Sequence, residues 1–507
     1  MSAPTNASPQ AQDTSVFPDP VYARTVLAPL FDAARTSHVA GFRAIDAAHC
    51  VMLAETGILT RNEAAAIARA LAEIAREIDP ARLVYTGEVE DYFFLVERAL
   101  KDRVGPDLGG RLHTARSRND IDHTLFKLAL KERIDAILAR SHALLAALIE
   151  TAARERDTIV VAYTHGQPAQ PSTFGHYLAA MIEVALRDVA RLEEARAIVD
   201  LCPMGAAAIT TSGFPIDRAR VAALLGFSAP LRNSYSCIAA VDYQTATFSA
   251  LELLFLHLGR PIQDFQTWSS FEVGQLYVPN ALVQVSSIMP QKRNPVPIEH
   301  LRHLASQVVG RARAMRDVMH NTPFTDMNDS EGETQEMGYQ AFAVAERALD
   351  LLAALVAQVR IDPARVAQNV ARSCITITEL ADTLVRREGL SFRQAHEIAA
   401  ATARAVVAAG GTLVADGHAP FAAAFREAIG REPGLTAADF AVAVSAEHFV
   451  ATRDRYGGPA PAAMDEALAA YRDARDGLAT RIAERRAREA AASAERERAF
   501  AALIEER

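Results

Sequence analysis

Apolar residues recur every three or four positions over long stretches of this chain, the pattern of a helix with one buried face. Between Lys131 and Glu150 the apolar positions are Ile134, Ile137, Leu138, Leu144, Leu145, Leu148 and Ile149. The same period recurs in four segments near or above about 20 residues long, 172–199, 239–260, 299–320 and 335–360. The pattern predicts an all-α fold built around a bundle of long helices.

One segment between the predicted helices, residues 285–295, carries two prolines, Pro290 and Pro295. Proline fixes φ and lacks an N–H, so neither a helix interior nor a central strand passes through both positions. We therefore expect a loop that exposes the polar side chains of Ser286, Ser287, Lys292 and Asn294. An ordinary solvent-exposed loop without any binding role has the same polar composition, and it is the alternative interpretation. A hydroxyl, an ammonium and a carboxamide together also suit a carboxylate ligand whose neighbouring carbon loses a proton.

Composition indicates a large protein of ordinary globular type. The chain has 507 residues, half of them apolar, which allows roughly two to four domains. Its formal net charge of −9 offers no basic surface for nucleic acid or an anionic membrane. The four cysteines are far apart and lack C-x-x-C spacing, which fits free thiols in a reducing cytoplasm better than disulfides or a zinc site. They are Cys50, Cys202, Cys237 and Cys374.

The first 20 residues form a tail rather than a targeting signal. They contain no Lys or Arg and no apolar core, and they are rich in Ser, Thr, Pro and Gln. This composition predicts disorder and no secretory signal. We expect no membrane span, because no uncharged apolar run in the chain reaches about 18 residues.

The order of residues in 285–295 resembles a signature of the fumarase/aspartase superfamily, Gly-Ser-Ser-x-Met-Pro-x-Lys-x-Asn-Pro, with Val285 in place of the leading glycine. Residues 112–120 are similar to a second signature, Thr-Gly-Arg-Ser-Arg-Asn-Asp, and residues 164–171 to a third, Thr-His-x-Gln-x-Ala-Gln-Pro. These two narrow the resemblance to the argininosuccinate lyase family. Further similar segments are 203–208, 215–218 and 392–397.

The resemblance implies a three-domain fold of the fumarase/aspartase type whose long-helix bundle forms the core of a homotetramer. We expect a disordered tail (1–20), an N-terminal helical domain (21–120), the central bundle (121–372) and a C-terminal helical domain (373–507). Each active site of the family is built by three chains, and we expect the same here. The charged end of the chain, about residues 478–507, is expected to be a solvated helix or a subunit contact.

The resemblance also implies a reaction, the elimination of an amine from an N-substituted aspartate with release of fumarate. By this resemblance Ser286 removes the Cβ proton, and Lys292 stabilises the charge that develops on the adjacent carboxylate. His165 passes a proton to the departing nitrogen, and Glu299 is its charged partner.

The remaining expected site residues bind the substrate. They are Ser117, Arg118, Asn119, Thr164, Gln167, Asn294 and Asn328. We expect no metal and no cofactor, and His113, His123 and His176 are interpreted as structural.

Four departures from the family pattern fall on the side where the amine is expected. Phe93 replaces a usual histidine, Val241 a usual arginine, Pro168 a common arginine and Asn328 a glutamine. The identity of the leaving amine is therefore open. The substrate is either argininosuccinate or another aminocarboxylate, as for ethylenediamine-disuccinate lyase. A third interpretation is a catalytically silent structural relative, against which the intact Ser286 argues.

Overall fold

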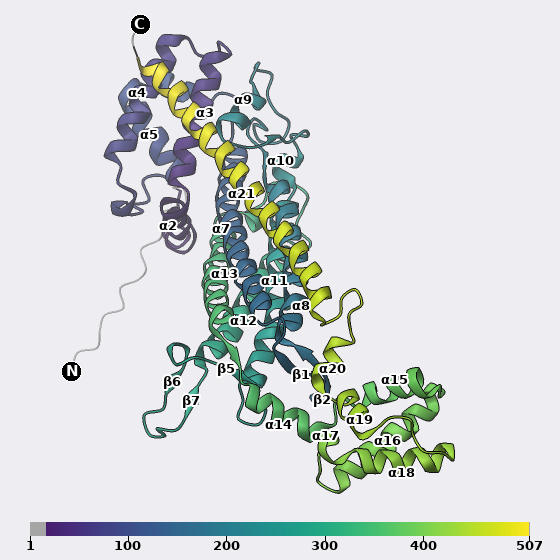
Figure 1. Ribbon diagram of the computed structural model, residues 1–507. Helices are drawn as coiled ribbons and strands as arrows, with labels where there is room; N and C mark the ends of the chain where they lie inside the picture. The colour runs from purple at the N-terminus through teal and green to yellow at the C-terminus, as the bar shows by residue number, and fades with distance from the viewer. Residues whose placement is uncertain (1–16, 506–507) are drawn as a thin grey trace, which may run out of the picture.

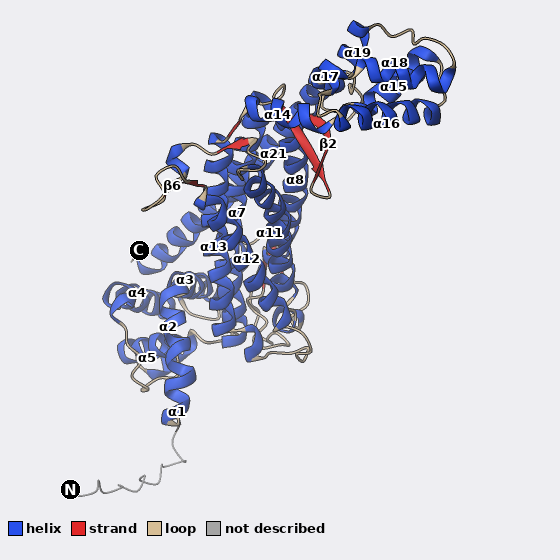
Figure 2. Cartoon of the chain, turned by 90° about the horizontal axis from the view of Figure 1, so that it is seen from below, coloured by secondary structure: helices blue, strands red, loops and turns tan. Residues whose placement is uncertain are grey.

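A computed structural model describes residues 17–505 (Figure 1). Of the predicted disordered tail, residues 1–16 lie outside the described part of the chain. The described residues form an elongated helical bundle that carries a smaller group of helices at each end (Figures 1 and 2).

The N-terminal group packs against one end of the bundle. Its helices are α1 (Pro20–Tyr22), a π-helical turn (Ala23–Leu27), α2 (Ala28–Ser37), α3 (Val39–Glu55), α4 (Arg61–Glu77), a 3-10 turn (Pro80–Arg82), α5 (Tyr92–Val104) and α6 (Pro106–Arg111). At the start of α4, the Thr60 hydroxyl accepts from the N–H of Glu63, whose carboxylate accepts from the N–H of Thr60. This reciprocal cap satisfies two amide groups that no helical bond can reach.

Five long helices form the central bundle, and they coincide with the five periodic segments of the sequence. They are α7 (Arg118–Arg154), α8 (Phe174–Val199), α11 (Asp242–Trp268), α12 (Val296–Asp317) and α13 (Gly332–Gln358). All seven apolar residues predicted for one face of α7 are buried. The helix packs against α8 and α13, while α11 packs against α12. The prediction of an all-α bundle is confirmed.

Among the described helices, only α7 is long and apolar enough to pass a test for a membrane-spanning segment. Half of its most apolar stretch is buried inside the protein. The helix also buries charged side chains, including Asp120, Lys127 and Lys131. These contacts identify α7 as the core helix of the bundle.

The described strands are short and pair only in twos. The pairs are β1 (Ile159–Thr164) with β2 (Gln167–Thr173), β3 (Leu201–Cys202) with β4 (Ala229–Pro230), β5 (Leu276–Tyr277) with β8 (Arg360–Ile361), and β6 (Gln284–Val285) with β7 (Arg293–Asn294). Between β3 and α11 lie the short helices α9 (Arg218–Leu224) and α10 (Ser236–Ala239), and two 3-10 turns occur at Asn280–Leu282 and Asn328–Ser330. Two of the three signature segments, expected as loops, are thus hairpins: β1–β2 and β6–β7.

The C-terminal group begins with α14 (Pro363–Ser373), which lies beside β1. It continues with α15 (Ile377–Glu388), α16 (Phe392–Ala408), α17 (Leu413–Asp416), α18 (His418–Ile429), α19 (Ala437–Ala443) and α20 (Ala446–Ala451). Its apolar core is separate from that of the bundle and includes Leu384, Phe421, Phe425 and Phe440.

The last helix, α21 (Pro461–Ile504), leaves this group and runs back along the bundle to the N-terminal helices (Figure 1). Its residues Met464, Leu468, Leu478 and Ile482 are buried in the core of the bundle. The expectation of a solvated helix or a subunit contact is therefore wrong for this inner face, which packs within its own chain.

Ion pairs add to this packing. Arg196 of α8, almost fully buried, contacts Asp135 at 3.0 Å and Asp200 at 3.2 Å, and it also pairs with Glu489 of α21. Lys131 of α7 lies 3.1 Å from the same Glu489. Charged residues of α21 thus complete a buried network that joins it to α7 and α8.

Candidate functional site

The first signature segment forms the start of α7. The Ser117 hydroxyl accepts a hydrogen bond from the N–H of Asn119 at 3.4 Å, and the Ser117 N–H donates to Asp120 at 2.8 Å. The second oxygen of the Asp120 carboxylate accepts from the N–H groups of Gly205 and Ala207 at 2.9 and 3.0 Å. Asp120 therefore fixes the segment by joining the helix start to the loop after β3.

Arg118, the first residue of α7, has partners within its own chain. Its guanidinium lies 2.9 Å from Glu90 and 2.7 Å from Asp91, and it also stacks over the ring of Phe94. The side chain is 39% exposed. A substrate carboxylate would thus have to share this guanidinium with two protein carboxylates, so the expected clamp role of Arg118 stays a prediction.

The second segment is the tip of the β1–β2 hairpin. Thr164 and Gln167 pair across the hairpin, and His165 and Gly166 form the turn with φ values of +53° and +73°. A two-residue turn with positive φ at both positions matches the twist of the flanking strands. All four residues are exposed, so the hairpin holds His165 away from the body of its own chain.

The third segment is the tip of the β6–β7 hairpin. The Ser286 hydroxyl oxygen accepts hydrogen bonds from the N–H groups of Ile288 and Met289 at 3.4 and 3.1 Å. Lys292 is exposed and forms no ion pair within residues 17–505, and Asn294 pairs with Gln284 in the ladder. The two N–H groups favour an ionised Ser286 oxygen, which is what a serine base needs.

Glu299 lies in the first turn of α12, just after this hairpin, and is exposed. The described residues show no hydrogen bond or ion pair between Glu299 and His165. Their expected partnership stays a prediction.

Asn328 is exposed in the loop between α12 and α13. The same loop brings Asp326 to 3.8 Å from His123 of α7, so Asn328 belongs to the end of the bundle that holds Arg118. Burial and the neighbouring Asp326 raise the pKa of Glu331, at the end of this loop, above its usual range.

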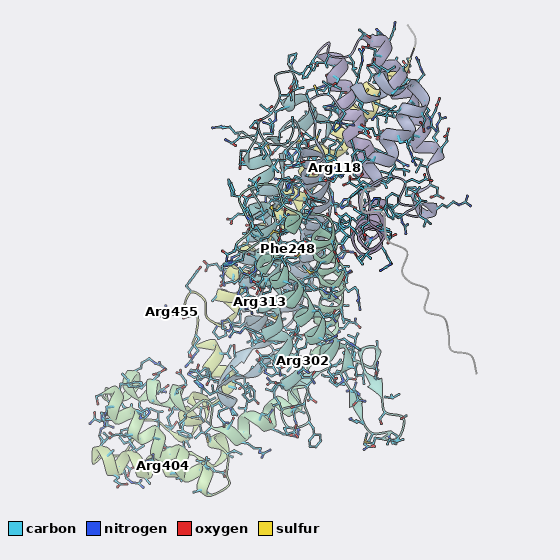
Figure 3. The ribbon with its side chains drawn as sticks, turned by 180° about the vertical axis from the view of Figure 1, so that it is seen from behind. Arg118, Phe248, Arg302, Arg313, Arg404 and Arg455 are labelled. Carbon is cyan, nitrogen blue, oxygen red and sulfur yellow. The ribbon has the colours of Figure 1, made fainter. Side chains whose placement is uncertain are left out.

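The expected site residues thus fall into two groups at opposite ends of the bundle. Ser117, Arg118, Asn119 and Asn328 lie at one end, and both hairpins with Glu299 lie at the other. Figure 3 shows Arg118 near one end and Arg302, which lies three residues after Glu299 in α12, near the other. The 37 residues of α7 span about 55 Å.

The two hairpins themselves leave the bundle on different sides (Figures 1 and 2). One chain therefore does not bring the three signature segments together.

Sequence reasoning missed a cluster formed by His123, Asp326 and Glu331, whose donor atoms lie within 4.8 Å of one another. His123 was interpreted as structural because it stands beside a signature segment without any ligand spacing. Its two partners lie about 200 residues later in the chain. Only the fold brings them together.

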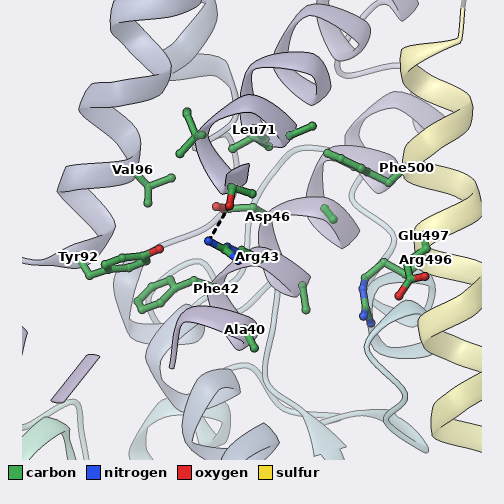
Figure 4. A pocket seen from close by; sticks show the side chains of 15 residues that line it. Ala40, Phe42, Arg43, Asp46, Leu71, Tyr92, Val96, Arg496, Glu497 and Phe500 are labelled. Carbon is green, nitrogen blue, oxygen red and sulfur yellow. Dashed lines mark hydrogen bonds between the residues drawn. The ribbon is translucent and has the colours of Figure 1, made fainter. Parts of the chain in front are cut away.

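A cavity of about 370 Å³ lies away from all of these residues, between α3, α4, α5 and α21 (Figure 4). Its walls include Phe42, Leu71, Val96 and Phe500. It contains none of the expected site residues, so we assign it to the packing of α21 on the N-terminal helices.

Two family profiles and two named relatives match this chain in sequence. A family profile described as "Lyase" matches residues 32–310, and one described as "Argininosuccinate lyase C-terminal" matches residues 374–451. The chain is 68% identical over 496 residues to argininosuccinate lyase 2 of Agrobacterium fabrum, with 98% of each chain covered. It is 36% identical over 437 residues to argininosuccinate lyase of Methanoculleus marisnigri, with 85% of this chain and 86% of the relative covered.

Among solved structures, EDDS lyase in complex with formate superposes with a TM-score of 0.85 at 28% identity, covering 94% of this chain and 95% of that one. Class II fumarase from Schistosoma mansoni shares the fold. It superposes with a TM-score of 0.65 at 15% identity, covering 85% of this chain and 92% of that one. The chain belongs to the argininosuccinate lyase family of the fumarase/aspartase superfamily.

Proposed function

We propose that this protein cleaves argininosuccinate into arginine and fumarate in the cytoplasm, as a homotetramer whose sites are each built from three chains. Membership of the family makes the chain a carbon–nitrogen lyase. The 68% identity to a protein named argininosuccinate lyase 2, over nearly the whole of both chains, is the observation that carries the choice of substrate.

The reaction begins at the β6–β7 hairpin. Ser286, as the oxyanion favoured by the N–H groups of Ile288 and Met289, takes the proton from Cβ of the succinyl group. The electron pair left on Cβ delocalises into the adjacent carboxylate, where Lys292 and Asn294 balance the added negative charge. The ammonium of Lys292 is available for this task because it pairs with no described carboxylate.

The carbon–nitrogen bond breaks next. The electron pair on Cβ forms the double bond of fumarate, and the pair of the broken Cα–N bond stays on the nitrogen, which takes a proton from His165. Glu299 of another chain would hold His165 in its protonated form. Two further segments bind the substrate's carboxylates. The first contributes Ser117, Arg118 and Asn119, and the second contributes Thr164 and Gln167. Asn328 lies on the side of the departing amine.

The opposite placement of the signature segments supports a site made by several chains. A closed homo-oligomer brings opposite ends of antiparallel bundles side by side without any change within the chain. The cytoplasmic location is supported by the four cysteines, which are all buried and unpaired.

A lyase for another aminocarboxylate is the second candidate. It is favoured by the superposition with EDDS lyase and by Phe93, Pro168, Val241 and Asn328, which depart from the usual pattern of argininosuccinate lyases. The test is to incubate the protein with fumarate and single amines, including arginine and ethylenediamine, and to identify the adduct by mass. Adduct formation with ethylenediamine and not with arginine would reject argininosuccinate as the substrate.

A further inference from the structure

Three carboxylates near the start of α7, those of Asp122, Asp326 and Glu331, form no ion pair with any Lys or Arg of the described residues. Arg118 is close to them, but Glu90 and Asp91 already engage its guanidinium. All three are half-buried, with the Asp326 side chain 31% exposed, and carboxylates that are partly withdrawn from water and lack a cation are costly. This end of the bundle therefore has unbalanced negative charge.

A buried histidine faces the same place. The side chain of His123 is 0% exposed, and its Nε2 has no hydrogen-bond partner in the described part of the chain. The Oδ1 atom of Asp326 lies 3.8 Å from this Nε2 and also lacks a hydrogen-bond partner among the described residues. Buried polar atoms are nearly always paired, so two such atoms facing each other indicate a ligand.

The other nitrogen of His123 is held in place. Its Nδ1 hydrogen-bonds to the hydroxyl of Tyr243 at 3.1 Å, and that hydroxyl accepts from the side-chain amide of Gln244 at 2.9 Å. When Nδ1–H donates to Tyr243, Nε2 carries the free lone pair that can bind a metal ion. A hydrogen bond that fixes the second ring nitrogen is the usual support of a metal-binding histidine.

We propose that His123, Asp326 and Glu331 bind a divalent transition-metal ion, with Zn²⁺, Co²⁺ and Mn²⁺ as the ions that suit one imidazole nitrogen and two carboxylate oxygens. The three donor atoms lie within 4.8 Å of one another. Tetrahedral ligands at about 2.0–2.1 Å from zinc are roughly 3.3 Å apart. A modest inward rotation of the two loop carboxylates closes the site around the ion.

The ion would connect the loop between α12 and α13 to the core of the bundle. Asp326 and Glu331 stand on either side of Asn328 in this loop, whereas His123 is buried in α7. Binding would thus fix the backbone that carries Asn328, and it would stabilise the folded chain through a ligand set that the unfolded chain lacks.

The test uses the full-length protein, stripped of metal by a chelator and titrated with Co²⁺, and with Zn²⁺ in competition. The variants Asp326→Asn and Glu331→Gln each remove one ligand charge without changing side-chain size. Glu333→Gln is the matched control, because Glu333 is exposed two residues further along the same segment. Visible absorption of bound Co²⁺ reports the coordination, and thermal unfolding without metal checks that each variant folds.

The proposal predicts one ion per chain, a rise in unfolding temperature on binding, and an affinity loss of at least about tenfold in both ligand variants but not in the control. Absence of binding at about 1 mM Co²⁺, or an affinity that both ligand variants leave unchanged, would overturn it. Unchanged metal affinity together with weaker arginine binding in both variants would also overturn it, and would assign the cluster to an organic cation.

Discussion

Arg118 and Arg154 are the first and last residues of one unbroken helix, α7, so the bundle separates them by about 55 Å. The first belongs to a signature segment, and the second lies just before the β1–β2 hairpin that carries another. This distance is the structural reason to expect a site shared between chains.

Replacing Ser286 tests its proposed role as the base that removes the Cβ proton. Replacing Ser286 by Ala should lower kcat on the order of 10²–10⁴-fold, because the variant loses the group that accepts the Cβ proton. Ser287→Ala is the matched control, since Ser287 is exposed in the same hairpin tip and should leave the rate nearly unchanged. Steady-state release of fumarate measures both. The reverse pattern would assign the base to Ser287 instead.

Replacing Lys292 tests its proposed role, the stabilisation of the charge that develops on the substrate's carboxylate. Lys292→Ala should cost about 3–4 kcal/mol of transition-state stabilisation, similar to the loss of an oxyanion donor. Unfolding temperature should stay unchanged, because Lys292 is exposed and unpaired within the described chain. Gln291→Ala, one residue earlier and also exposed, is the control. Equal kcat values for Lys292→Ala and the parent would remove Lys292 from the mechanism.

Acid should destabilise the fold through two buried histidines. Burial lowers the pKa of His38 to about 4 and that of His49 to about 3, whereas both titrate near 6.5 when unfolded. The unfolded chain therefore binds more protons below pH 6.5, and stability falls as pH decreases from there towards the folded pKa values. Each histidine should cost about 2 kcal/mol between pH 7.5 and pH 5.

Urea unfolding at the two pH values measures this loss. His49→Gln is the informative variant, since the ring donates from Nε2 to the carbonyl of Thr114 at 2.9 Å and an amide can replace that donor. This variant should lose less stability on acidification than the parent. An equal loss in both would show that His49 is not a source of the pH dependence.

The attachment of α21 is tested at Arg196. Arg196→Met should destabilise the protein by about 1.5–3 kcal/mol, the loss of charged hydrogen bonds to Asp135. Of the described cations, Asp135 then keeps only Arg485 at 3.4 Å, whereas Asp200 keeps Lys131 and Arg488. Arg472→Ala, on an exposed position of α21, should be nearly neutral. Denaturant unfolding compares the two. A small effect of Arg196→Met would mean that Lys131, Arg485 and Arg488 are enough to neutralise the two carboxylates.

The bundle could be predicted from the sequence because its signal is local. The period of three and four in α7 gives the buried face directly, and Thr173 caps α8 where a helix start was expected. The packing of α21 could not be predicted in this way. Its apolar residues are sparse, and its charged residues find their partners, such as Glu489 with Arg196, only through the fold.

The same limit applies to the site. Ser286, Lys292 and His165 were recognisable because each lies within a contiguous motif. The partners of Arg118 were not predicted, because Glu90 and Asp91 come from another element. Nor could a single sequence show that the motifs lie at opposite ends of one helix.

The proposal that active sites are shared between chains is tested most directly by mixing two inactive variants. Arg118→Ala and Ser286→Ala chains are purified separately, mixed, and allowed to exchange, with mass analysis of differently tagged chains to prove exchange. If different chains supply the two residues, about a quarter of the sites in randomly mixed tetramers contain neither lesion, and activity should return to that extent. Hybrids that have exchanged and remain inactive would contradict a site shared between chains.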